Sequence, residues 1–418
     1  MPNLPRLRLA LTSFCLGMIV LHAILFWTVR RQIVAGSSDF RIFYAAGLMF
    51  RRGESRALYN LELQAKTERE FALPGVQRGG PLPYNHPPFE AVLYVPLTYL
   101  RYFPAYCVWF VINTLLVAGS ILRVRSYLPT LLGDFRALLI LTPLAFFPVA
   151  YALLQGQDSI LLMALYFLAY AALRTGKDSQ AGVYLGLGLF KFHLVIPFAF
   201  ILLLRRRWRA LAGMTAVALA EILVSWAIVG KSQLIYYPHF AWQVNRQQAP
   251  GVIVPENMAN LRGLFLGWNA MNSPSHWAEI ALVLASVGLI VWAPRQWKPA
   301  DVRDSRSWNF GFSLCLVVSY LVGYHGYNQD MSLLLLPLLL ALDWALADWT
   351  AVRRGFKVVL VLLLLSPLYL LLTLKMSHQN LFSIVLLCFA GYLAAYAATT
   401  ARPAWVNRST GPPSVPLQ

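Results

Sequence analysis

The sequence predicts an all-α integral membrane protein, and three observations support this fold class. Of the 418 residues, 58% are hydrophobic and only 12% are charged, whereas roughly a quarter of a soluble domain is charged. Apolar runs of about 20 residues, the length of a spanning helix, recur along the whole chain. Aromatic residues are frequent, with 24 Phe, 20 Tyr and 13 Trp, as expected for rings at lipid–water interfaces. We therefore expect a polytopic helical bundle.

The apolar runs predict the membrane segments. They cover residues 9–29, 103–122, 136–154, 158–173, 180–204, 208–229, 277–293, 309–324, 329–346, 356–374 and 381–399. The first run is longer than the apolar region of a signal peptide and lacks a small-x-small cleavage site, so we interpret it as a retained helix. Lys and Arg form short clusters between the runs, a pattern that sets orientation in a bilayer. The net charge of +18 therefore does not indicate a nucleic acid partner.

The fifth run differs from the others because it carries helix-weakening and charged residues. Gly186, Gly188 and Pro197 interrupt it, and Lys191 and His193 lie at its midpoint. Basic clusters flank both of its ends, so two half-helices that enter the membrane and return would keep every cluster cytoplasmic. This interpretation gives about twelve membrane segments, with both termini cytoplasmic. A straight helix, which gives about eleven segments and inverts one half, remains open.

These segments predict one transmembrane domain over residues 1–405 and a short disordered tail at 406–418. The largest extracytoplasmic loop covers 30–102, in which "ESRALYNLELQAKTEREF" has helical periodicity and is expected to lie on the membrane surface. A Pro- and Gly-rich loop follows it. The "LQGQDS" turn, a loop at 230–276 and the "GYHGYNQD" turn are expected on the same side.

Asp39 is the first candidate for chemistry, in the stretch "SSDFRIFYAAG". It either caps a helix beginning near Phe40 or acts as a general base. The interpretation of Asp39 as a general base rests on its position at the start of a long extracytoplasmic loop, beside Arg41 and one helical turn before Tyr44. A carboxylate there can accept a proton from a sugar hydroxyl.

Other polar residues are expected near Asp39. Tyr84 and His86 lie in "PYNHPPF", whose prolines stiffen the loop, although a plain interfacial turn also explains it. Gln157 of "GQDS" is expected to face a cavity, whereas Asp158 is interpreted as a helix cap. A charged side chain such as Lys191 in the middle of a membrane segment is costly in free energy, so Lys191 indicates a functional site. His193, two residues later, is expected to belong to the same site.

Two later segments add the remaining candidates. The "YHGYNQD" turn holds His325, Tyr327 and Asp330, the last of which also suits a helix cap. The 230–276 loop adds Asn257 and Arg262, which can bind hydroxyls or phosphate.

Several motifs are absent. There is no G-x-x-x-x-G-K-[ST] loop for a nucleotide and no H-E-x-x-H motif, and the histidines are scattered. The four cysteines lie in apolar runs without Cys-x-x-Cys spacing, which is typical of packing residues. We therefore expect no metal and no cofactor.

In order and spacing, these motifs resemble glycosyltransferase family 87, which comprises integral-membrane GT-C enzymes that use polyprenyl-phosphate mannose or a related lipid-linked sugar. The resemblance rests on Asp39-Phe40 with Tyr44 and Ala46-Gly47, Arg56-Ala57-Leu58-Tyr59, Tyr84 with Pro87-Pro88-Phe89, Gly156-Gln157, the Lys191 segment and "GYNQDMSLLLLPLLLAL". Gln329 before Asp330 and "NHPP" depart from the family pattern, which leaves the donor sugar open.

The resemblance implies a multi-pass GT-C-type fold in the cell membrane, here a bacterial inner membrane, with the active site on the extracytoplasmic side. It implies an inverting, metal-independent transfer from a polyprenyl-phosphate sugar to a glycolipid, glycan or protein, among membrane lipids. Asp39 would be the general base and His325 a second polar group near the sugar. From their positive charges, we expect Lys191 and Arg262 to contact the lipid phosphate. A secondary transporter or lipid-sugar flippase that uses the broken helix at Lys191 and His193 is the alternative.

Overall fold

The computed structural model of the chain describes residues 4–72, 82–246, 254–267, 276–298 and 305–398, and no strand occurs among them. The predicted all-α class is confirmed. The helices are α1 (Leu4–Val34), α2 (Phe40–Arg51), α3 (Leu61–Phe71), α4 (Pro88–Ala91), α5 (Tyr102–Val124), α6 (Pro129–Leu132), α7 (Arg136–Ala145), α8 (Phe147–Gln155), α9 (Ser159–Arg174), α10 (Asp178–Gly186), α11 (Phe192–Leu204), α12 (Trp208–Arg246), α13 (Leu261–Leu266), α14 (His276–Gln296), α15 (Ser305–Val322), α16 (Leu335–Ala347), α17 (Arg354–Leu364), α18 (Ser366–Leu370) and α19 (Phe382–Ala398).

The helices identify a multi-pass membrane protein. Within the described ranges, six are long and apolar enough to cross a bilayer, and three bent pairs raise this number to nine if each pair is one span. The bent pairs are α7 with α8, α10 with α11, and α17 with the segment that begins at α18. The expected count of about twelve segments stays a prediction.

The predicted break in the fifth apolar run is present. The α10 and α11 segments are bent by 61°, and the 3₁₀ turn Leu189–Lys191 lies between them. The α10 helix packs closely on α12, because a Cβ atom added to Gly182 would lie 1.8 Å from the carbonyl oxygen of Ala210. Glycine therefore permits this close backbone approach.

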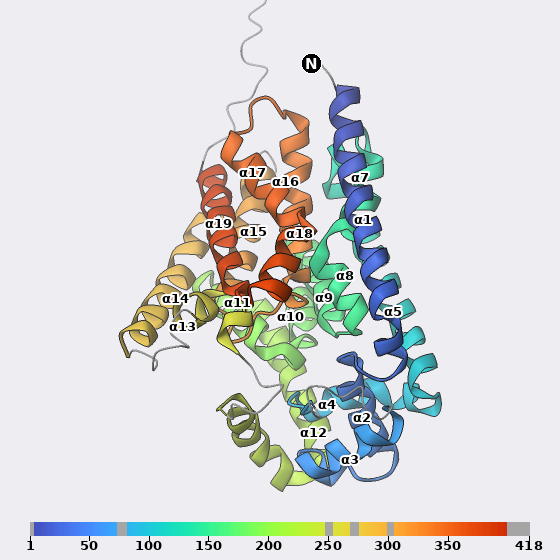
Figure 1. Cartoon of the computed structure of the whole chain (residues 1–418). Coiled ribbons are helices and arrows are strands. Elements are labelled where there is room, and N and C mark those ends of the chain that lie inside the picture. The colour runs from blue at the N-terminus through green and yellow to red at the C-terminus, as the bar shows by residue number, and fades with distance from the viewer. Residues whose placement is uncertain (1–3, 73–81, 247–253, 268–275, 299–304, 399–418) are drawn as a thin grey trace, which may run out of the picture.

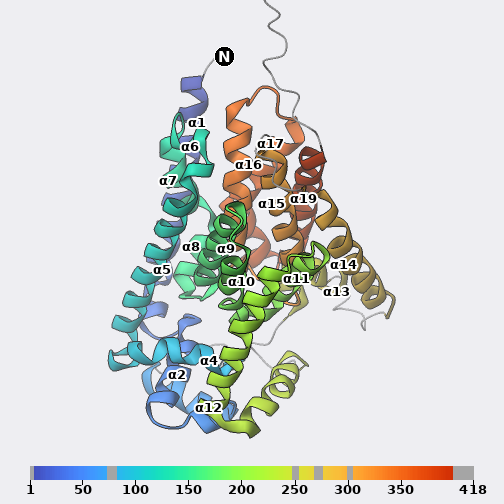
Figure 2. The same ribbon diagram turned by 180° about the vertical axis from the view of Figure 1, so that it is seen from behind.

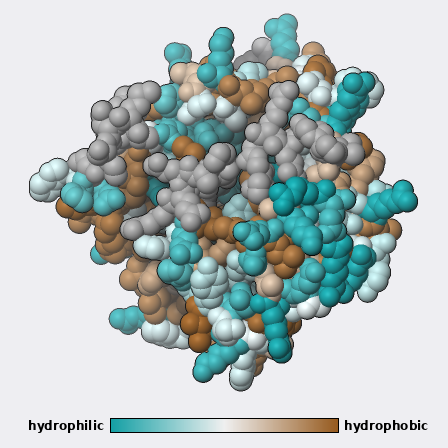
Figure 3. Space-filling model, turned by 60° about the horizontal axis from the view of Figure 1, so that its bottom comes forward, coloured by the Kyte–Doolittle hydropathy of each residue, from teal (hydrophilic) through white to brown (hydrophobic). Residues whose placement is uncertain are grey.

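Figures 1 and 2 show how the helices are arranged. The α1 helix runs beside α5 and α7 along one side, and α15, α16, α17 and α19 form the opposite part of the bundle. The α2, α3 and α4 helices and the second half of α12 lie together at the end far from the start of α1. Figure 3 brings this end forward and shows many hydrophilic residues on it, with apolar residues along one side.

Two of the predicted loops contain helices. The amphipathic segment of the first loop forms α3, and its N-cap Asn60 accepts a hydrogen bond from the Leu63 amide. The prediction of a loop from residue 230 is wrong for residues 231–246, because α12 continues to Arg246 after a kink at Gly230, where φ is 78°. Residues 73–81 of the Pro/Gly-rich loop and the 406–418 tail lie outside the described residues.

Candidate active site

A cavity of about 560 Å³ lies where α2, the 82–87 loop and the α10–α11 break meet the 325–330 turn. Its wall is rich in polar side chains, and many residues singled out in the sequence line it. These are Asp39, His86, Gln157, Lys191, His193, Asn257, His325, Tyr327 and Asp330. The structure thus brings together side chains from six separate stretches of sequence.

Asp39 faces this cavity and does not cap α2 with its side chain. It occupies the N-cap position but makes no capping hydrogen bond. Its Oδ2 accepts a hydrogen bond of 2.7 Å from the Gln157 amide, while the Asp39 backbone amide donates to Gln155. Burial raises the pKa of Asp39, and the Gln157 hydrogen bond and the Arg41 charge oppose this rise. A cavity-lining carboxylate with a raised pKa has the chemistry to act as a general base when it is ionised.

Lys191 forms the centre of a buried ionic network. Its ammonium lies 2.9 Å from Asp158 Oδ1 and 2.6 Å from Asp330 Oδ1, and it donates to Ser159 at 2.8 Å. The three side chains of the ion pairs are at most 5% exposed. Because an ammonium has three donors, these contacts occupy all of them. Lys191 therefore stabilises the two carboxylates in this arrangement.

His193 and His325 lie next to each other on the cavity wall, with ring centroids 5.3 Å apart. Within the described part of the chain, His193 Nε2 and His325 Nδ1 are buried without a hydrogen-bond partner. Burial, followed by the neighbouring His193 and Arg262, lowers the pKa of His325 well below its usual value. Two neutral imidazoles with free nitrogen atoms can therefore bind a polar ligand here.

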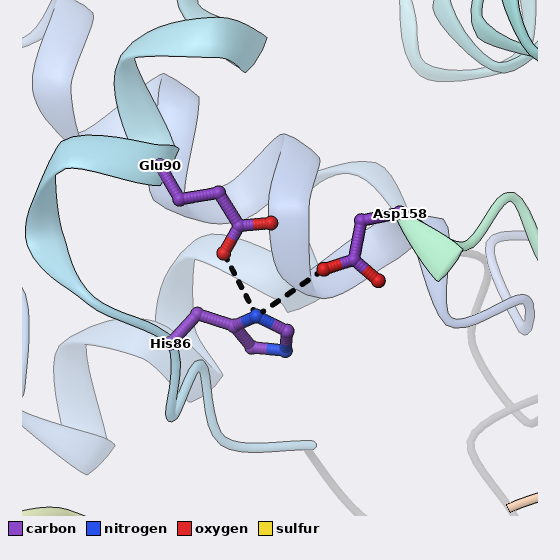
Figure 4. A group of neighbouring side chains, drawn as sticks. All are labelled: His86, Glu90 and Asp158. Atoms are coloured by element: carbon purple, nitrogen blue, oxygen red, sulfur yellow. Dashed lines mark ion pairs between the residues drawn. The ribbon is translucent and has the colours of Figure 1, made fainter. Parts of the chain in front are cut away.

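His86, Glu90 and Asp158 form a second cluster of polar side chains beside the cavity. His86 Nδ1 is 2.8 Å from Glu90 Oε2 and 3.5 Å from Asp158 Oδ2, as Figure 4 shows. Burial raises the pKa of Glu90 to about 8 against the opposing attraction of His86. His86 lines the cavity, whereas Glu90 and Asp158 do not.

Four sequence candidates do not line the cavity. Arg41 is buried and lies 3.5 Å from Glu68. The Tyr44 hydroxyl donates to the Leu100 carbonyl, and the Tyr84 hydroxyl donates to the Pro87 carbonyl. Arg262 donates to the Tyr324 carbonyl and lies 3.9 Å over that ring.

Sequence reasoning missed two acidic residues of this site. The interpretation of Asp158 as a helix cap is wrong, because its side chain makes no capping hydrogen bond and instead pairs with Lys191. Glu90 was not considered. Its spacing of four residues from His86 is the signal that could have identified it, since an i and i+4 pair can meet on a helical turn.

Comparison with known proteins identifies the family of the chain. The model of glycosyltransferase family 87 matches residues 84–323. The chain belongs to glycosyltransferase family 87. The matched region contains Gln157, Lys191 and His193 and begins after Asp39.

One curated relative is the polyprenol-phosphate-mannose-dependent alpha-(1-2)-phosphatidylinositol pentamannoside mannosyltransferase of Mycolicibacterium smegmatis. It is 26% identical over 213 residues, which are 50% of this chain and 49% of the relative. The chain thus matches about half the length of that relative. No solved structure matches the chain.

Proposed function

We propose that this protein is a membrane glycosyltransferase that transfers mannose from a polyprenyl-phosphate donor to an acceptor hydroxyl. The observation that carries the proposal is the Asp39 carboxylate, which is held by Gln157 at 2.7 Å on the wall of the polar cavity. Family membership and the name of the relative support the reaction class and the donor. That relative's name also supports a glycolipid acceptor.

Asp39 acts as the base in a single displacement. The acceptor oxygen attacks the anomeric carbon, the bond between that carbon and the phosphate oxygen breaks, and Asp39 takes the hydroxyl proton. The products are the glycoside with inverted configuration and polyprenyl phosphate. The donor already carries an activated leaving group, so the enzyme must align the two substrates and stabilise charge on the phosphate. No metal ion at the reacting atoms is required.

We assign the leaving phosphate to His193 and His325. Both line the cavity, and each has a buried ring nitrogen without a partner in the described residues. Arg262, whose charge acts on His325, contributes at longer range. Lys191, whose donors are occupied, supports the phosphate site by holding Asp158 and Asp330.

Two apolar grooves adjoin the polar cavity and suit lipid chains. One, of about 220 Å³, lies between α1, α8 and α18 and shares Tyr151 and Thr373 with the cavity. The other is bounded by Trp242 and Tyr324 and shares His193 and His325 with it. A lipid-linked donor can therefore place its phosphate in the cavity and its chain in a groove. We place the active site on the extracytoplasmic face as part of the same proposal.

A donor screen tests the proposal. Purified protein in detergent is incubated with radiolabelled polyprenyl-phosphate mannose and lipid extract, and labelled products are separated from the donor. We expect a labelled glycolipid. Recovery of the donor unchanged, with uptake of label into proteoliposomes that hold the protein, would instead support a transporter.

A further inference from the structure

His86, Glu90 and Asp158 present one imidazole nitrogen and two carboxylate groups to one another. Their donor atoms all lie within 4.8 Å of one another, and the distances from His86 Nδ1 to the two acids are 2.8 and 3.5 Å. Two donors on one metal ion, each about 2.0–2.2 Å from it, lie about 3–3.5 Å apart. Figure 4 shows both carboxylates pointing toward the imidazole. The spacing therefore suits a shared ion.

The burial of these groups is the second, independent observation. Glu90 and Asp158 are both 0% exposed. Both oxygens of Glu90 lack a hydrogen-bond partner of good geometry within the described ranges, and Oε2 lies 2.8 Å from His86 Nδ1. A buried carboxylate is costly unless it is paired or binds a metal.

The charges nearby leave a deficit of positive charge. Asp158 shares the Lys191 ammonium with Asp330. The ion pair of Glu90 within the described residues is with His86. With a neutral imidazole, three ionised carboxylates and one ammonium leave two negative charges in a buried place, which either protons on His86 and Glu90 or one divalent cation can offset. One divalent cation balances them, with Asp158 using Oδ2 for the ion and Oδ1 for Lys191.

We propose that His86, Glu90 and Asp158 bind one divalent transition-metal ion, Zn²⁺ or Mn²⁺. A mixed set of imidazole and carboxylate donors suits these ions better than Mg²⁺ or Ca²⁺, which prefer oxygen alone. Glu90 and Asp158 do not line the cavity, so the ion lies behind its wall. It holds His86 and Asp158 in place and does not contact the sugar or the phosphate. The inference therefore goes beyond the proposed transfer reaction.

Metal analysis of the purified full chain tests this site. The protein is desalted, and its Zn and Mn are measured by mass spectrometry against protein concentration. We expect about one ion per chain in the wild type and a loss of at least tenfold in Glu90→Gln. Glu62→Gln, the same change at an exposed position of α3, should keep the ion. Equal metal content in both variants would show an adventitious ion only and would overturn the proposal.

Chelation of the wild type provides a second readout that needs no variant. We expect 1,10-phenanthroline or EDTA to lower the melting temperature, and added Zn²⁺ or Mn²⁺ to restore it. Mg²⁺ alone should not restore it. A wild type without stoichiometric metal, whose melting temperature the chelator leaves unchanged, would show that protons on His86 and Glu90 balance the charge instead. Sugar transfer is measured separately, so failure of the metal site is distinct from failure of the proposed function.

Discussion

Lys191→Met is expected to destabilise the protein strongly. The substitution keeps most of the side-chain volume but removes the ammonium that lies 2.9 Å from Asp158 and 2.6 Å from Asp330. Both carboxylates are at most 3% exposed, so they would remain buried without their cation. Removal of one partner of a buried ion pair costs about 3–5 kcal/mol. We expect a loss of this size in folding free energy.

The assay is thermal unfolding in detergent, followed by tryptophan fluorescence. Lys177→Met is the matched control, because Lys177 is exposed and its loss should change stability by less than about 0.5 kcal/mol. The double variant Lys191→Met with Asp330→Asn should recover part of the loss, with a coupling of about 0.5–3 kcal/mol. If Lys191→Met melts like the control, the ionic network does not stabilise the fold and our reasoning is refuted.

Two further predictions concern the base and the helix packing. Gln157→Leu removes the hydrogen bond to Asp39 that opposes the rise in the pKa of Asp39. Because the base must be ionised, activity should be lost at a higher pH in the variant than in the wild type as the pH is lowered. An unshifted pH profile of kcat/KM would contradict this. Gly182→Val places side-chain atoms against the Ala210 carbonyl and should lower the melting temperature by several degrees. Gly119→Val is the control and should have a smaller effect, because nothing lies within 4 Å of a Cβ atom added there. Equal melting temperatures of the two variants would argue against close packing of α10 on α12.

The sequence predicted the main features of the fold because they follow from local properties. Apolar length identifies a spanning helix, so the multi-pass class was predictable. The break near Lys191 was predictable because glycine and proline weaken a helix and a buried charge needs a polar cavity. The continuation of α12 beyond Gly230 was missed, because a glycine followed by polar residues resembles a loop.

The site was predicted less completely, since its contacts join distant segments. An acid before a helix resembles a cap, so the pairing of Asp158 with Lys191 could not be read from local sequence. Tyr44 was expected to share a face with Asp39. However, α2 is buried over nearly its whole length, so a shared helical face does not imply a shared cavity. The Tyr44 hydroxyl instead donates a hydrogen bond to the Leu100 carbonyl.

The transfer activity of Asp39→Asn tests the central claim most directly. The amide keeps the shape of the side chain and can still hydrogen-bond Gln157. It is too weak a base to take the proton from the attacking hydroxyl of the substrate. We expect the rate of mannose transfer from the polyprenyl-phosphate donor to fall by about 10²–10⁴, with the melting temperature and donor binding close to those of the wild type. Transfer at the wild-type rate by a well-folded Asp39→Asn variant would contradict the assignment of Asp39 as the base.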